Sequence, residues 1–268
     1  MQTESFHLGR PGQQCHCTLT HPETRLVRPA AVVMCHPFGH EYYRSYRAYQ
    51  RIAGQLAGMG FPVLAMDYSG TGDSEGSPGG VSLGHWVEDL VLAIGEQQRR
   101  SGVKDIVLVG LRFGASMALL AARQLSRLST VVLWEPVWSG RQYLQSLEDL
   151  NRRMLLDTDR FMTPRARADL APAEYLGAIY APTLLADIES LDPDSLCGAQ
   201  IEHGLLIEGN AGDTGRRLAP EELVPSAAWQ CVRVPGDYGW DDAGRLEESI
   251  IAPSVTRHIA HHLHEIHQ

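Results

Sequence analysis

The sequence lacks the segments that address a protein to a membrane, to secretion or to nucleic acid. No apolar stretch reaches the roughly 18 residues of a membrane span. The first five residues, Met1-Gln-Thr-Glu-Ser, lack the basic and apolar regions of a signal peptide. The formal net charge is -9, and no basic run exists to neutralise phosphates. We therefore expect a cytoplasmic protein with no membrane span and no nucleic-acid partner.

The chain also lacks a disulfide framework and a complete metal-ligand pattern. Its five cysteines are widely scattered. Cys15-His16-Cys17 has no second pair of ligands to complete a metal site, and the five histidines between His258 and His267 are more typical of a solvated helix face. The sequence accordingly predicts no metal and no cofactor.

Strand-like and helix-like stretches alternate along most of the 268 residues, of which 44% are hydrophobic. This alternation favours right-handed βαβ units and a mostly parallel sheet, with ligands beyond the carboxyl ends of the strands. An antiparallel meander is expected at residues 6–20 and 24–28. The further expected strands are residues 30–34, 61–66, 105–109, 130–134, 203–208 and 228–234. The helices expected between and after them are residues 46–59, 86–100, 115–128 and 253–264.

The strand pattern stops after Trp138 and resumes near His203. Helices are expected within the interruption at residues 142–154, 164–170, 173–179 and 182–191. We interpret residues 1–138 and 199–268 as the α/β core. Residues 139–198 are then an inserted helical cap, and we refer to them as the cap segment.

The stretch Gly110-Leu-Arg112-Phe-Gly114 has the frame of a nucleophile elbow, Gly-x-Ser-x-Gly, at the end of a strand and the start of a helix. The two glycines suit a tight turn in which a Cβ would clash. Arginine stands where the serine of this motif belongs. A guanidinium stays protonated and only donates hydrogen bonds, so Arg112 cannot be a nucleophile.

Two further motifs complete a family resemblance. Asp67-x-x-Gly70-x-Gly72-x-Ser74 resembles a loop of the serine-aminopeptidase-like branch of the α/β-hydrolase superfamily, and His36-Pro-Phe38-Gly39 resembles its oxyanion segment. The resemblance covers nearly the whole chain. It implies an α/β-hydrolase fold with N-terminal antiparallel strands and a helical cap, an ester or thioester hydrolase ancestry, and backbone N–H groups at Phe38 and Gly39 that face a reacting carbonyl.

A narrower resemblance is carried by the elbow, by residues 133–140 and by residues 235–240 with 251–253. These segments are similar to the exosortase A system-associated hydrolases, in the subset with a basic residue at the elbow. That resemblance implies a bacterial setting of exopolysaccharide and surface-protein export, alongside acyl-carrier and acyl-activating proteins. It implies no particular activity, because the word hydrolase there rests on the fold.

The usual triad base is missing as well as the serine. It belongs after the last strand, near residues 235–240, yet no histidine occurs between His203 and His258. Glu208 or Asp213 suits the acid position, but an acid with no base to orient does nothing by itself. Ser116, one helical turn after Arg112, is expected to point into packing. Ordinary serine hydrolysis is therefore not expected.

Histidines near the expected strand ends offer another mechanism. His36 or His40 would act as a general base on water or substrate, oriented by Glu41 or Glu135. The alternative is that His36 and Glu41 only fix the oxyanion segment by hydrogen bonds. The sequence favours the structural alternative without excluding the catalytic one.

Arg112 opens a helix, where the macrodipole already supplies positive charge and the N–H groups of Phe113 and Gly114 point outward. A cation there calls for an anion. Either a carboxylate of the protein (Glu41, Glu135 or Glu208) seals the site, or a ligand carboxylate or phosphate binds the guanidinium fork. The aromatic residues expected to form a rim, unless they pack in the core, are Trp134, Trp138, Tyr143 and Trp240.

Three functional hypotheses follow. The first is a protein that binds an acyl or carboxylate small molecule at Arg112, either free or carried on an acyl carrier protein or coenzyme A. The second is a hydrolase or acyltransferase of non-serine mechanism that uses His36 or His40. The third is a non-catalytic partner protein of an exopolysaccharide and exosortase system that docks through the cap segment.

Overall fold

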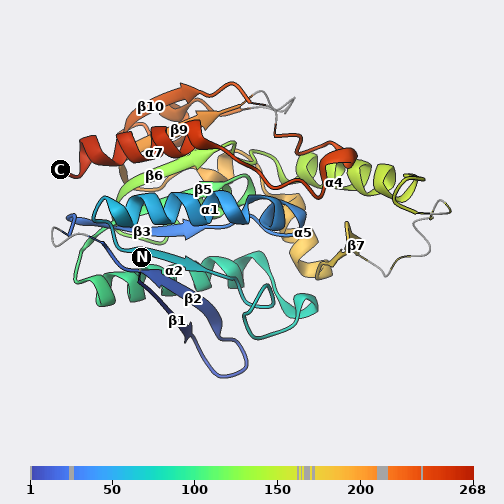
Figure 1. The fold of residues 1–268 in the computed structure, drawn as a ribbon, viewed down its shortest axis with the longest axis horizontal. Coiled ribbons are helices and arrows are strands. Elements are labelled where there is room, and N and C mark those ends of the chain that lie inside the picture. The colour runs from blue at the N-terminus through green and yellow to red at the C-terminus, as the bar shows by residue number, and fades with distance from the viewer. Residues whose placement is uncertain are drawn as a thin grey trace.

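The computed structural model describes residues 2–23, 27–161, 163, 165, 170, 173–209, 217–236 and 238–268. Its core is an eight-stranded sheet in the order β1-β2-β4-β3-β5-β6-β9-β10 (Figure 1). Strands β1 and β2 are antiparallel to each other, β2 is antiparallel to β4, and the other neighbours are parallel. The strands are β1 Thr3–Leu8, β2 Cys15–Thr20, β3 Ala30–Cys35, β4 Val63–Met66, β5 Asp105–Leu111, β6 Leu128–Trp134, β9 Ile201–Glu208 and β10 Ala228–Arg233.

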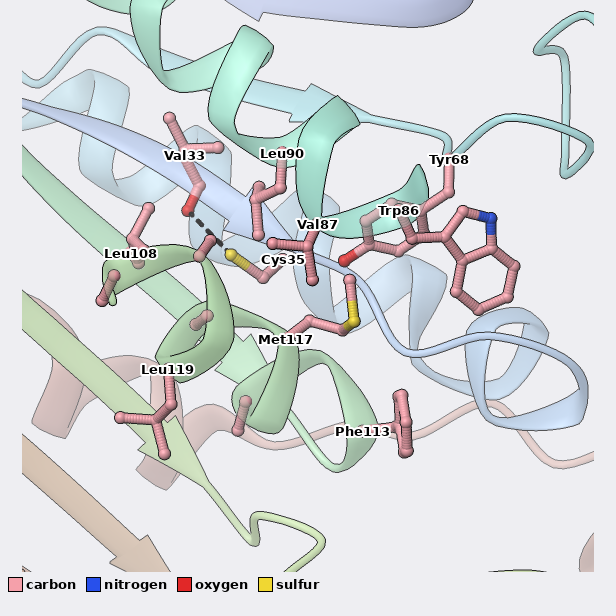
Figure 2. Packing of buried hydrophobic residues seen from close by; sticks show 14 of the residues in the cluster. Val33, Cys35, Tyr68, Trp86, Val87, Leu90, Leu108, Phe113, Met117 and Leu119 are labelled. Atoms are coloured by element: carbon pink, nitrogen blue, oxygen red, sulfur yellow. Dashed lines mark hydrogen bonds between the residues drawn. The ribbon is translucent and has the colours of Figure 1, made fainter. Parts of the chain in front are cut away.

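Helices cover both faces of this sheet. Because side chains alternate along a strand, β3 sends Ala31, Val33 and Cys35 into one core cluster and Ala30, Val32 and Met34 into the other. The first cluster is closed by α2 and α3, and the second by α1 and α7. Figure 2 shows the first cluster, where Leu90 and Val87 of α2 face Cys35 of β3 and Met117 of α3. The helices are α1 His40–Gly58, α2 Leu83–Ser101, α3 Phe113–Ala122, α4 Gly140–Leu155, α5 Pro182–Ser190, α6 Pro220–Leu223 and α7 Pro253–Ile266.

This architecture confirms the predicted α/β-hydrolase fold class, with a mostly parallel sheet and antiparallel N-terminal strands. Within the cap segment, α4 packs against α5, as expected for two of its helices. The expected helix at residues 164–170 lies largely outside the described residues, and so do residues 24–26 of the expected meander. The division into core and cap segment stays a prediction.

Residues 173–179 are not the expected helix. They form a hairpin of β7 Glu174–Tyr175 and β8 Ala178–Ile179. Its two turn residues, Leu176 and Gly177, have φ values of 51° and 81°. Positive φ at both central positions is the type I′ geometry that matches the twist of a hairpin. The amide of Leu176 donates to the Asn151 side chain at 2.9 Å, which fixes the turn on α4.

Two helix boundaries also differ from the expectation. Helix α1 begins at His40 instead of Tyr46, since Gly39 with φ 61° is its N-cap and Glu41 lies in its first turn. An acidic side chain is favourable there. Helix α3 ends at Ala122 instead of Leu128, because Leu128 pairs with Ile201 as the first residue of β6.

Candidate functional site

Arg112 connects the end of β5 to the start of α3 in a strained conformation, with φ 51° and ψ −125°. Its amide donates to the carbonyl of Trp134 at 2.9 Å. Its carbonyl accepts from the amides of Ala115 at 3.0 Å and Val137 at 3.4 Å. A non-glycine residue holds such a backbone only where its neighbours fix it. The turn therefore has the conformation of a nucleophile elbow, with an arginine side chain at its tip.

The flanking glycines are required by close approach, as their spacing predicts. A Cβ on Gly110 would lie 2.5 Å from Cα of Ala115. A Cβ on Gly114 would overlap the carbonyl oxygen of Cys35 and lie 2.7 Å from the carbonyl carbon of His36. Helix α3 thus leaves the elbow in contact with the end of β3.

A buried ion pair joins the elbow to α1. Nε of Arg112 lies 3.0 Å from Oε1 of Glu41, and the two side chains are 12% and 1% exposed. The hydroxyl of Tyr143 donates to Oε2 of Glu41 at 3.5 Å. Burial alone would lower the pKa of Arg112, but the Glu41 and Glu135 carboxylates outweigh it and raise that pKa. Of the three carboxylates suggested by the sequence, Glu41 is the one that pairs with Arg112.

The loop after β10 contributes Trp240. Its Nε1 donates to Oε2 of Glu135 at 2.5 Å. The guanidinium of Arg112 lies 5.5 Å from the Trp240 ring centroid. Burial raises the pKa of Glu135, while the bond from Trp240 and the charge of Arg112 oppose that shift. Trp240 therefore occupies the region where the sequence analysis places the missing triad base.

Arg44 is a site residue that sequence reasoning missed. It is 2% exposed and donates to three backbone carbonyls, those of Gly239, Tyr238 and Glu248. Its guanidinium lies 5.3 Å from the Trp240 ring. The helical spacing from Glu41 to Arg44 was the available signal, because residues three apart share one face of a helix. Arg44 fixes the loop that carries Trp240.

A cavity of about 280 Å³ opens over Arg112 and Glu41. Helix α4 supplies one wall, including Tyr143, Leu147 and Leu150, and Trp240 supplies another. Among the described residues, no hydrogen-bond partner is found for the two terminal nitrogens of Arg112. Glu41 therefore does not close the cavity, and apolar side chains form part of its walls.

The predicted general bases lie in different places. His40 lines the same cavity as Arg112, and burial lowers its pKa. Neither ring nitrogen of His40 has a hydrogen-bond partner within the described part of the chain. His36 instead lies against the rings of Tyr42 and Tyr49, with centroids 5.3 and 4.2 Å away, and lines a separate cavity. The structure thus brings His40 to Arg112 and not His36.

The backbone N–H groups predicted to bind an anion are likewise divided between two places. Phe38 and Gly39 line the separate cavity with His36. The rings of Phe38 and Phe113 pack 4.9 Å apart in the core. The amides of Phe113 and Gly114 open α3 beside Arg112, where a helix has no intrahelical acceptor for them.

Of the four expected rim residues, Trp134 was placed wrongly. It is 1% exposed and packs in the core cluster of α1 and α7, 5.4 Å from the Tyr238 ring, because its side chain leaves β6 on that face. Tyr143 and Trp240 line the Arg112 cavity, and Trp138 lines a small space of about 20 Å³ beside Arg112 and Glu135.

Three other candidates from the sequence have different roles. Ser116 is fully buried and donates to the carbonyl of Val137 at 2.6 Å, which confirms that it points into packing. Glu208 pairs with Arg217 at 3.2 Å, and Asp213 lies outside the described residues. Burial raises the pKa values of Cys15 and Cys17 to about 12, so both thiols are protonated at neutral pH.

Comparisons with known proteins agree with this geometry. The serine aminopeptidase S33 family matches residues 28–208 of the chain. No helix among the described residues is long and apolar enough to cross a membrane. No curated protein sequence matches the chain.

Solved structures are similar over almost the full length. Est1E from Butyrivibrio proteoclasticus with bound ferulic acid is 17% identical, with 97% of this chain and 98% of that chain covered and a TM-score of 0.67. A hypothetical protein from Pseudomonas aeruginosa is 21% identical, with coverages of 98% and 93% and a TM-score of 0.63. Proline iminopeptidase from Mycobacterium smegmatis is 14% identical, with both coverages 98% and a TM-score of 0.61. At these identities the likeness shows the fold alone.

Proposed function

The chain belongs to the serine aminopeptidase S33 family of α/β hydrolases, and from this premise we propose that it binds an acidic or acyl-type small molecule at Arg112. The observation that carries the proposal is the end of the Arg112 guanidinium, which has no partner among the described residues and faces a cavity of about 280 Å³. Glu41 engages Nε only. The two terminal nitrogens are left to a carboxylate or a phosphate, which a guanidinium binds with two parallel hydrogen bonds.

The charges around Arg112 are mixed, because the carboxylates of Asp149 and Asp241 line its cavity together with Glu41. Glu41 balances one positive charge, but Arg44 supplies a second within contact of the same tryptophan. The amides at the start of α3 add positive potential from the helix dipole. Leu147, Leu150 and Trp240 provide apolar surface for an acyl chain beside that charge.

Loss of serine hydrolysis is part of the proposal. The elbow conformation is retained, yet its side chain is a permanent cation. The loop that would supply the base delivers Trp240, whose indole nitrogen only donates. A retained elbow without nucleophile or base supports a binding role for a pocket that was once catalytic.

Isothermal titration calorimetry tests this function. The ligands are short carboxylates, acyl phosphopantetheine and acyl coenzyme A, with Arg112→Gln compared with the wild type. We expect at least one of them to bind the wild type and to lose about tenfold or more in affinity in the variant, because a charge-assisted hydrogen bond contributes about 1.5–3 kcal/mol. Arg127→Gln, which removes an exposed ion pair, is the matched control. Equal binding by wild type and Arg112→Gln would remove the proposed site.

A second candidate function is hydrolysis or acyl transfer with His40 as general base. Its support is that His40 lines the cavity that Arg112 lines and that burial lowers the pKa of its imidazole, so a ligand anchored on Arg112 lies within the same walls. We expect turnover of an ester or thioester panel to collapse in His40→Asn and to persist in His36→Asn, because His36 lines another cavity. Turnover lost equally in both variants, or absent from the wild type, would contradict this candidate.

The exosortase-associated setting is a proposal about partners. It is supported by the similarity of the elbow, of residues 133–140 and of residues 235–240 to that group. An acyl carrier protein would present an acyl group to the Arg112 cavity. Loading a purified acyl carrier protein with an acyl chain should then increase its affinity for this chain relative to the unloaded form. Equal affinity of the two forms would contradict the proposal.

A further inference from the structure

A second and larger cavity, of about 540 Å³, lies beyond the ends of β3 and β4. Its walls come from residues 36–39, the loop at residues 67–76, the start of α1, Trp86 of α2 and the hairpin of β7 and β8. It shares no lining residue with the Arg112 cavity. The hydroxyl of Tyr180 lies directly against Gly39, and both residues line this larger cavity. The two cavities are therefore distinct sites.

Aromatic rings dominate the walls of this second cavity. Tyr68 and Trp86 stack with ring centroids 5.3 Å apart and 26° between planes (Figure 2). Phe38 lies 5.1 Å from Trp86 and 5.7 Å from Tyr180. Tyr43 is 75% exposed at the rim. Such walls attract apolar groups and, through the ring quadrupole, cations.

Four of the side-chain hydroxyl groups that line the cavity donate their protons to acceptors within the protein. Tyr42 donates to Oδ1 of Asp67 at 2.8 Å, and Tyr68 donates to the carbonyl of His36 at 3.1 Å. Thr71 donates to the carbonyl of Tyr68 at 2.8 Å, and Ser74 to that of Asp67 at 2.7 Å. These four side chains can therefore only accept hydrogen bonds from a ligand.

The charge of the cavity has one sign. Asp67 is its only lining carboxylate, and no lysine or arginine lines it among the described residues. Burial lowers the pKa of His36 to about 4, against the effect of Asp67, so the imidazole is neutral. His36 is 5% exposed, and its Nδ1 has no hydrogen-bond partner within the described residues. Asp73 adds a second carboxylate close to that of Asp67.

We propose that this cavity binds an organic ammonium ion, a primary amine attached to an aromatic or aliphatic group. Its N–H groups would donate to Asp67 and to the imidazole of His36, and its apolar part would lie against Trp86 and the tyrosines. A carboxylate would meet the negative charge of Asp67, and no lysine or arginine among the described lining residues balances that charge. Tyr42, Tyr68, Thr71 and Ser74 have already committed their protons, so these four side chains offer a neutral sugar no donor.

Calorimetry with phenethylamine, phenethyl alcohol and 3-phenylpropanoate tests the assignment, because these probes share a ring and differ in the terminal group. We expect the amine alone to bind the wild type. Its affinity should fall about tenfold or more in Asp67→Asn, since a charge-assisted bond is lost. Tyr43→Ala, an exposed change that cannot disturb the core, should weaken it as well by removing an aromatic wall. Arg127→Gln, a change in an exposed ion pair away from both cavities, should leave it unchanged.

Circular dichroism will test whether Asp67→Asn folds. If it does not fold, Tyr43→Ala gives an independent test of amine binding. The proposal fails if the wild type does not bind phenethylamine at millimolar concentration or binds 3-phenylpropanoate equally well. It also fails if methyl glucoside binds in place of the amine, or if neither Asp67→Asn nor Tyr43→Ala weakens binding. Because Arg112 is not involved, failure here leaves the function proposed for Arg112 standing.

Discussion

The carboxylate of Glu41, in the first turn of α1, accepts from Nε of Arg112 at 3.0 Å across the mouth of the elbow. This contact spans 71 residues of sequence and joins the ends of β3 and β5. The elbow therefore carries a buried ion pair. Its consequences can be measured as changes in the free energy of unfolding and in labelling by a nucleophile-directed probe.

The Glu41→Gln variant should be strongly destabilised. Removing one charge of a buried pair leaves the other uncompensated, at a cost of about 3–5 kcal/mol. Urea denaturation measures the loss, and the double variant Arg112→Met, Glu41→Gln should recover much of it. The matched control is Glu202→Gln, whose pair with Arg127 is exposed, with an expected change within about 1 kcal/mol. Equal losses for Glu41→Gln and Glu202→Gln would contradict a stabilising role for the buried pair.

The glycine after Arg112 should not tolerate a methyl group. A Cβ at Gly114 would overlap the Cys35 carbonyl, and backbone atoms cannot move as a flexible side chain can. We expect Gly114→Ala to lose about 3 kcal/mol or more. Gly95→Ala is the control, because Gly95 lies in α2 with nothing within 4 Å of its Cβ position, and should gain about 0.5–1 kcal/mol. A stable Gly114→Ala protein would show that α3 leaves the elbow differently.

A fluorophosphonate probe should not label the wild type. Arg112 is no nucleophile, and Ser116 is buried with its hydroxyl bonded to Val137. The double variant Arg112→Ser, Trp240→His returns a serine to the strained elbow and a histidine to a position bonded to Glu135. We expect labelling of this double variant and none of Trp240→His alone. Labelling of the wild type would instead reveal a nucleophile that the geometry does not provide.

Most of the fold could be predicted because buried parallel strands appear in the sequence as short continuous apolar runs, such as Ala30–Met34. The hairpin of β7 and β8 could not, since Leu176 takes a positive φ that its residue type disfavours and that Asn151 helps to hold. Leu128 looked helical because apolar spacing alone does not distinguish the end of a helix from the first residue of a buried strand.

The sequence predicted most of the residues at the site but not which of them contact one another. The position of Arg112 at a helix N-terminus predicted a neighbouring anion. Only the tertiary structure shows that this anion is Glu41 and not Glu135 or Glu208. Trp134 and Trp240 both read as aromatic residues near strand ends, and the face of the sheet decides that one is core and the other contacts Arg112. The division of His36 and His40 between two cavities depends on where α1 begins.

Buried histidines should make the protein unstable in mild acid. Burial lowers the pKa values of His36 and His262 from 6.5 to about 4. Between these pH values the unfolded chain binds more protons than the folded chain, so the free energy of unfolding falls as the pH falls from about 6.5 toward 4. His262 packs near His203 and His267, and its Nδ1 lies 2.7 Å from Oε1 of Gln230. Thermal melts across this range should show a falling Tm.

The matched variants separate this effect from general acid denaturation. His262→Gln replaces the titrating ring with a neutral side chain and should flatten the fall of Tm with pH. His261→Gln, at a neighbouring position that is 66% exposed, should keep the slope of the wild type. If both variants keep the wild-type slope of Tm against pH, the protons that destabilise the fold bind to groups other than His262. Paired carboxylates such as Glu96, whose pKa Arg99 and Arg100 lower to about 2, would reduce the Tm only at lower pH.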